Sequence, residues 1–136
     1  MGTRARVTVI AAAVLATTPA YFERFRHGDK QPLALAQGRP FRGDLPGLYE
    51  VVLGAEVARQ LGYRLGDKLT LSHGGSEMPG AEHADKPFQV VGLLAHVGTQ
   101  LSRDRLEIDE HAWIPISTLQ ANWPRWWTDE FVVSKI

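Results

Sequence analysis

The chain has 136 residues, enough for one domain or two small subdomains, and 44% of them are hydrophobic, which is sufficient for a buried core. Fifteen basic and fifteen acidic residues cancel, which argues against a nucleic-acid-binding protein because such a protein needs a basic face. The absence of cysteine excludes a disulfide scaffold and thiolate chemistry.

The longest apolar run, residues 7–16, is shorter than the ~20 residues that span a bilayer. Two interpretations fit this run. It has basic residues before it and small residues after it, as a signal peptide has. It could equally be a strand buried on both faces. The following residues 19–25 predict one or two helical turns, with Tyr21, Phe22 and Phe25 as the apolar stripe.

The clearest pattern lies in the middle of the chain. Residues 51–53 are a short apolar run that predicts a strand end, and residues 55–61 carry apolar side chains at helical spacing. Gly62 stands where a left-handed helix C-cap favours glycine. A Gly-Asp dipeptide then predicts a turn into a strand at residues 69–71.

The second half of the chain predicts three or four more strands. Residues 88–95 are expected to pair antiparallel with the strand that begins at Leu69, and Gly92 within them indicates a bulge or a close backbone approach. Residues 104–111 alternate between apolar and charged side chains, as an edge strand does.

Residues 112–116 form the next predicted strand, and Pro115 confines that strand to an edge or to its own last residues. Ser117 is a good N-cap for a helix at residues 118–122. Residues 131–136 read as a closing strand.

Several segments, taken in order, carry a family resemblance. They are the Thr-Thr-Pro turn before Tyr21, the Gly-Arg-Pro-Phe element of residues 38–41, residues 51–71, the Val-Val-Gly-Leu-Leu strand of residues 90–94 and the strand-Pro-helix return after residue 112. Together they resemble the extracytoplasmic core domain of MacB-like and FtsX-like ABC-type permeases. The resemblance favours the strand interpretation of residues 7–16.

The resemblance implies an α+β fold, with a small mixed sheet, short helices and a β-rich inserted subdomain. Residues 1–49 and 111–136 would form a first, porter-like layer, and residues 50–110 the β-rich small subdomain. The front portion of the family's domain and its four membrane helices have no counterpart in the sequence. The chain would then be the second half of that domain, either as an excised piece or as a free-standing relative.

By the same resemblance, the chain would be a non-catalytic domain on the periplasmic face of the bacterial inner membrane. It would couple ATP-driven motion to a periplasmic partner or substrate, such as an adaptor protein. The ATPase subunit would act on it through membrane helices that tether it. No nucleic acid, cofactor or metal is implied.

The loops at residues 74–87 and 96–103 are the expected partner-facing surfaces. Five residues in or near them are the candidates for contacting a partner: His83, Asp85, Thr99, Arg103 and Trp126.

Two alternatives belong to other classes of protein. A secreted small-ligand-binding module would use the aromatic cluster of residues 123–127, in which Trp and Arg are typical of interfaces. A small metal-dependent enzyme would use His73, Glu82 and His83, since imidazoles and carboxylates bind zinc.

Other signals for chemistry are weak. The potential metal ligands have irregular spacing, and they are His73, Glu77, Glu82, His83, Asp85 and His96. Neither a Gly-x-Ser-x-Gly elbow nor a phosphate loop occurs. The carboxylates of residues 107–110 are expected to be solvated charges, Arg39 an exposed loop arginine, and the Arg-Gly-Asp tripeptide of residues 42–44 a chance occurrence.

Overall fold

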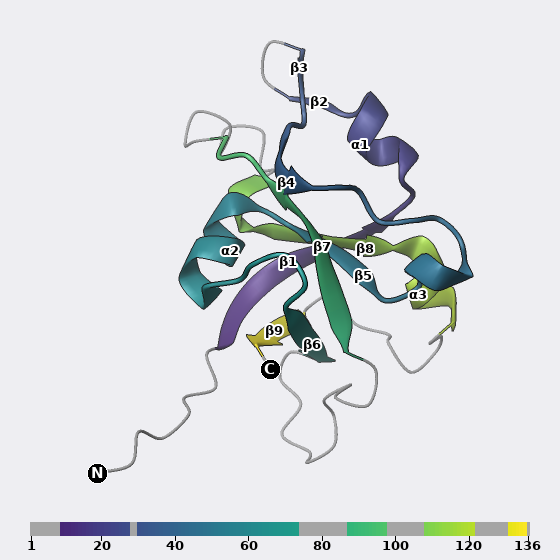
Figure 1. Cartoon of the computed structure of the whole chain (residues 1–136), viewed down its shortest axis with the longest axis vertical. Coiled ribbons are helices and arrows are strands. Elements are labelled where there is room, and N and C mark those ends of the chain that lie inside the picture. The colour runs from purple at the N-terminus through teal and green to yellow at the C-terminus, as the bar shows by residue number, and fades with distance from the viewer. Residues whose placement is uncertain (1–8, 28–29, 74–86, 98–107, 122–130, 136) are drawn as a thin grey trace.

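The computed structural model describes residues 9–27, 30–73, 87–97, 108–121 and 131–135. These residues form a seven-stranded mixed sheet, a two-stranded sheet and short helices (Figure 1), which confirms the predicted α+β class. The elements, in chain order, are β1 (Val9–Thr17), α1 (Ala20–Arg24), β2 (Arg26–His27), β3 (Gln31–Pro32), β4 (Leu35–Gly38), η1 (Leu45–Gly47), β5 (Glu50–Leu53), α2 (Ala55–Leu61), β6 (Lys68–His73), β7 (Phe88–Leu94), η3 (Ile108–Glu110), β8 (His111–Pro115), α3 (Ile116–Ala121) and β9 (Phe131–Lys135).

The large sheet has the strand order β4-β7-β5-β8-β1-β9-β6, and β6 also pairs with β7. The second pairing closes the sheet on itself, because β7 and β6 are otherwise far apart in this order. The pairs β1–β8 and β5–β7 are parallel and the other pairs are antiparallel. The predicted antiparallel pairing of residues 88–95 with the strand at Leu69 is confirmed, through Leu69 and Phe88.

The strand β1 confirms the strand interpretation of the first apolar run. It lies between β8 and β9 in the sheet. The first residue of β1, Val9, is the register partner of Ser134 in β9. The strands β5, β6 and β7 come from residues 50–110 and pair with strands from the rest of the chain within this one sheet. The division into a porter-like layer and a β-rich subdomain stays a prediction.

One edge of β7 is bonded along its whole length by two stretches of chain, residues 66–69 and residues 35–39. The strand β6 pairs with its first two residues, the turn before β6 binds Val90 through the Gly66 N–H and the Asp67 carbonyl, the Arg39 N–H donates to the Val91 carbonyl, and β4 pairs with its last three residues. Backbone polar groups in the sheet are thereby satisfied at the point where β6 gives way to β4.

Gly38 and Gly92 face each other where β4 meets β7. A Cβ on Gly38 would lie 2.1 Å from the Val91 carbonyl oxygen, and a Cβ on Gly92 would lie 2.4 Å from the Arg39 carbonyl oxygen. The predicted irregularity at Gly92 is confirmed, because the register with β5 also shifts there and leaves Val91 unpaired with it. Only glycine permits this crossing.

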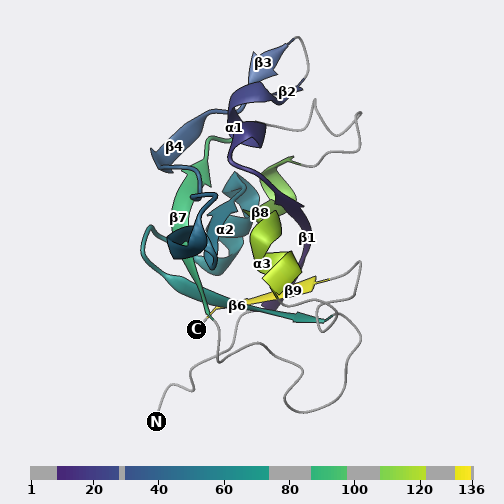
Figure 2. The same cartoon turned by 90° about the vertical axis from the view of Figure 1, so that its right-hand side faces the viewer.

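The inner face of the closed sheet holds one hydrophobic cluster. In β5 and β8 alternate residues point inward, as the two-residue period of a strand requires. The helix α2 contributes Val57 and Leu61 to this cluster, and Figure 2 shows α2 between β7 and β1. Gly62 ends α2 with φ 66°, the predicted left-handed cap.

The outer face of the same strands carries a second hydrophobic cluster, centred on Trp113 of β8 and covered by α1. The Phe22 ring lies 6.2 Å from Trp113 and 5.2 Å from Phe41 (centroid distances), and Tyr21 stacks on Phe25 at 4.8 Å. These contacts confirm the apolar stripe predicted for residues 19–25. Burial raises the pKa of Tyr21, and the neighbouring Trp113 indole opposes the rise.

Two local predictions are wrong. Ile108–Glu110 is a 3₁₀ helix and not part of an edge strand. Its Asp109 carboxylate accepts a hydrogen bond from the Val97 backbone, and such bonds compete with strand pairing. The helix α3 begins at Ile116, so Ser117 lies inside it and is not its N-cap. Pro115, with its fixed φ, ends β8, and the helix begins two residues earlier than predicted.

Candidate functional site

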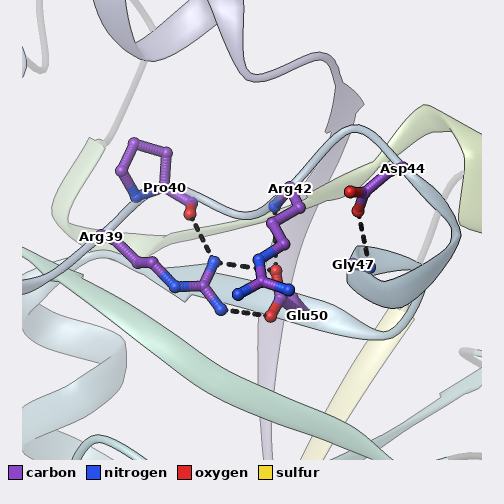
Figure 3. Close-up of polar contacts among 6 residues, drawn as sticks. All are labelled: Arg39, Pro40, Arg42, Asp44, Gly47 and Glu50. Carbon is purple, nitrogen blue, oxygen red and sulfur yellow. Dashed lines mark hydrogen bonds and ion pairs between the residues drawn. The ribbon is translucent and has the colours of Figure 1, made fainter.

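Residues 39–50 connect β4 to β5 and contain a network of polar contacts (Figure 3). Glu50, at the start of β5, is buried with 8% of its surface exposed. Its Oε1 accepts hydrogen bonds from Arg39 Nη1 at 3.0 Å and from the Arg42 backbone N–H at 2.9 Å, and its Oε2 accepts from Arg39 Nη2 at 2.5 Å. The paired guanidinium–carboxylate geometry is the strong form of this interaction.

This network compensates a buried charge. The hydrogen bonds from Arg39 hold the pKa of Glu50 below its ordinary value, against the opposing effect of burial, and the Arg42 N–H adds to the lowering. Arg39 Nη1 also donates to the Pro40 carbonyl at 3.0 Å. The Arg39 side chain is 43% exposed and Glu50 only 10%, so the pair reaches from solvent into the domain. Arg39 is therefore more than the exposed loop arginine that the sequence suggested.

The segment between Arg39 and Glu50 is held by hydrogen bonds of its own backbone and of two side chains, Asp44 and Thr118. The Asp44 side chain caps η1 by accepting from the Gly47 N–H at 3.2 Å, and the Leu48 N–H donates to the Leu45 carbonyl at 3.1 Å. The Thr118 hydroxyl of α3 donates to the Leu48 carbonyl. The acidic member of the Arg-Gly-Asp tripeptide thus serves as a helix cap in this fold.

Asp109 holds together the two ends of the connection between β7 and η3. One of its carboxylate oxygens accepts from the Val97 N–H at 2.8 Å, and the other lies 3.1 Å from His96 Nδ1. The Asp109 side chain is 14% exposed and the His96 side chain 72% exposed. The backbone hydrogen bond is therefore the more sheltered contact, while the contact to His96 is screened by solvent.

Replacing Asp109 by alanine is expected to lower the free energy of unfolding by about 1 to 2 kcal/mol, because the Val97 N–H loses its acceptor. Asp109→Asn retains a carbonyl oxygen for that N–H and should cost less than half as much. Urea unfolding followed by circular dichroism would measure both. Equal losses for the two variants would contradict the assignment of the main effect to the backbone bond.

The exposed face of α2 carries a further polar group, in which the Glu56 carboxylate accepts hydrogen bonds from Arg59 and Gln60. The bonds from Arg59, followed by the bond from Gln60, lower the pKa of Glu56 to about 2. These side chains stabilise the helix locally.

The five residues predicted to face a partner, His83, Asp85, Thr99, Arg103 and Trp126, lie outside the described residues. The two loops that would carry the first four join the described structure at opposite ends of β7, after residue 73 and before Pro87 in one case and after Val97 in the other. Seven residues of strand separate these ends by roughly 20 Å. The loops thus begin from opposite ends of one strand, and their role stays a prediction.

Most residues of the two alternative functions, the ligand-binding module and the metal-dependent enzyme, also lie outside the described residues. Glu77, Glu82, His83 and residues 123–127 lie outside the described residues, and His73 is described only as part of β6. Within the part of the chain that the structure describes, no group of three potential ligands could hold a metal ion. None of the helices in that part is long and apolar enough to cross a bilayer.

The sequence interpretation missed Glu50. A signal for it exists: Glu50 directly precedes an all-apolar strand, and a charged residue next to buried positions needs a partner. The arginine of the Gly-Arg-Pro-Phe element was the available partner of opposite sign. What the sequence does not give is the fold of residues 40–49, which brings positions 39 and 50 together.

The sequence of this chain matches one family of known proteins. The model of a family described as the MacB-like periplasmic core domain matches residues 2–134. That range contains every described element but the last residue of β9. A comparison with curated proteins found no match.

Proposed function

Because this chain belongs to the MacB-like periplasmic core domain family, we propose that it couples the ATP-driven motion of an ABC-type permease to a periplasmic protein partner without being a catalyst itself. Domains of this family are extracytoplasmic parts of ABC-type permeases, on the periplasmic face of the inner membrane. The chain is accordingly an extracytoplasmic transporter domain. The coupling and the partner are the parts that we propose.

The observation that best supports coupling is the closed sheet. Each of its strands β7, β5, β8, β1, β9 and β6 pairs on both sides. A displacement of one strand is therefore opposed by hydrogen bonds on two edges, and the sheet transmits motion as a body instead of deforming. The partner proposed is the adaptor-type or substrate protein encoded next to the permease and its ATPase.

The experiment uses the full-length permease that contains this chain, with its ATPase, in lipid nanodiscs. Binding of the neighbouring-gene periplasmic protein is measured by biolayer interferometry without nucleotide and with a non-hydrolysable ATP analogue. Coupling predicts affinities that differ by roughly fivefold or more between the two states. Linkage requires that the partner change the affinity for the ATP analogue by the same factor.

Equal partner affinity in the two nucleotide states would overturn the coupling. An absence of binding in both states would overturn the proposed partner.

A further inference from the structure

The loop between β4 and β5 exposes a large apolar side chain at its tip. Leu45 is 82% exposed, which is twice the exposed fraction of Leu65 or Ile116, the other exposed large hydrophobic residues in the described part of the chain. The next residue, Pro46, is exposed as well. A single exposed leucine is common on protein surfaces, and the informative feature here is that two consecutive apolar side chains, Leu45 and Pro46, are exposed at the tip of one loop.

The loop holds Leu45 in place instead of leaving it to move freely. Leu45 begins η1, which the Asp44 side chain caps. Gly47 in the same turn is buried, and a Cβ there would lie 2.5 Å from the Arg42 carbonyl oxygen, so the loop is folded tightly back on itself. The Arg42 N–H is bonded to the buried Glu50. The exposed side chain therefore stands on a preorganised support, which lowers the entropy cost of binding.

A second exposed apolar residue lies at the same end of the domain. The hydrogen bond from Thr118 to the Leu48 carbonyl joins α3 to the loop, and Ile116, the first residue of α3, is 41% exposed. Figures 1 and 2 agree that the blue coil of residues 45–47 and α3 occupy one end of the molecule, at the right of Figure 1. We call Leu45, Pro46 and Ile116 the apolar tip.

Charges of both signs stand next to the apolar tip. Arg42 and Asp44 are exposed, and they lie three residues and one residue before Leu45 in the chain (Figure 3). An anionic lipid surface attracts one of these charges and repels the other. A protein surface can offer an opposite charge to each of them, which is the usual arrangement at specific interfaces.

Building on the proposed function, we infer that the apolar tip inserts Leu45 into an apolar socket of the periplasmic protein partner. A basic group of the partner faces Asp44 and an acidic group faces Arg42. Burial of a leucine side chain corresponds to about a tenfold or larger gain in affinity.

The test measures binding of the neighbouring-gene periplasmic protein to the full-length permease carrying Leu45→Ser. The matched control is Leu65→Ser, an exposed leucine in the turn before β6. Leu45→Ser should weaken binding tenfold or more, and Leu65→Ser should change it less than twofold. Thermal unfolding of each variant confirms that the domain is folded.

A second variant, Arg42→Gln, removes the charge of the side chain and keeps the backbone N–H that bonds Glu50. Glutamine places no second negative charge beside the buried Glu50, whose charged form the Arg42 side chain also favours. This variant should weaken partner binding about threefold or more at low salt and less at high salt. This result distinguishes a charged socket from a purely apolar contact.

Three outcomes would overturn the inference. If the partner binds the wild type and Leu45→Ser equally, the apolar tip is not the docking surface, while the proposed function stands. If no partner binds the wild type, both fail. If the protein binds phosphatidylglycerol vesicles and Leu45→Ser abolishes that binding, the tip contacts lipid instead of protein.

Discussion

Replacing Gly38 by alanine is expected to lower the free energy of unfolding by about 3 kcal/mol or more. The new Cβ would lie 2.1 Å from the Val91 carbonyl oxygen. That oxygen belongs to backbone and accepts the Arg39 N–H at 2.9 Å, so it cannot move away without losing this bond. Overpacking of this kind costs about 1 to 3 kcal/mol, and alanine at the φ of Gly38, 79°, adds about 1 to 2 kcal/mol.

Gly66→Ala is the matched control for this variant. Gly66 has φ 88°, but a Cβ there would meet no atom within 4 Å. Its replacement should therefore show the cost of the backbone conformation alone, about 1 to 2 kcal/mol. Gly92→Ala measures the cost of crowding alone, because a Cβ there would lie 2.4 Å from the Arg39 carbonyl oxygen and Gly92 has no positive φ. Urea unfolding of the three variants separates the two costs. Equal losses for Gly38→Ala and Gly66→Ala would contradict the crowding at the β4–β7 crossing.

Replacing Arg39 by alanine should cost about 2 kcal/mol at pH 7, because Glu50 would remain charged and buried with only the Arg42 N–H as a partner. Breaking a fully buried pair costs about 3 to 5 kcal/mol. The smaller value applies here because the Arg39 side chain is 43% exposed. Glu50→Gln should cost about 1 kcal/mol, since its carbonyl oxygen can still accept from the Arg42 N–H.

The effect of the pair on stability should depend on pH with a definite sign. The folded state holds the pKa of Glu50 below its ordinary value, chiefly through the hydrogen bonds from Arg39. The stabilisation is therefore fully present above the unfolded pKa of about 4.3, and it is lost as the pH falls through the lower folded value.

The difference in unfolding free energy between wild type and Arg39→Ala should be constant from pH 7 to about pH 5 and shrink below about pH 4. Urea unfolding at each pH measures this difference. The variant Arg59→Ala serves as a control, since it removes an arginine from an exposed pair. A wild-type advantage over Arg39→Ala that persists unchanged below pH 4 would contradict the role of the Glu50 charge.

Elements specified by neighbouring residues could be predicted from the sequence. The helix α2 has apolar side chains at helical spacing and a glycine that can adopt φ 66° at its end, and both signals are local. The β7 strand and the irregularity at Gly92 could also be predicted, because their signals lie within the strand itself. One of the two wrong predictions falls where a contact from outside the segment overrides a local pattern: in η3 that contact is the bond between Asp109 and the Val97 N–H. The other, at the start of α3, has a local cause in the neighbouring Pro115.

The closure of the sheet could not be predicted. It depends on β6 pairing with β9, which lies about sixty residues later in the chain, and no local pattern records such a partner. The Arg39–Glu50 pair could not be predicted either, because it forms only when residues 40–49 fold back and bring the two side chains together. Four of the predicted partner-facing residues are polar and belong to loops, and the fifth, Trp126, belongs to an aromatic cluster. None of these properties by itself identifies a contact surface.

The pairing of Val9 with Ser134 has a mechanical consequence. The first residue of β1 and the end of β9 are register partners, so they lie about 5 Å apart. Under the proposed coupling, forces applied at these two points would act at nearly one place, which would serve as a pivot. The strand β1 has nine residues and reaches about 30 Å from that pivot, so a rotation of about ten degrees would carry its far end about 5 Å. The domain would then act as a lever that converts a small tilt at its base into a larger displacement at its opposite end.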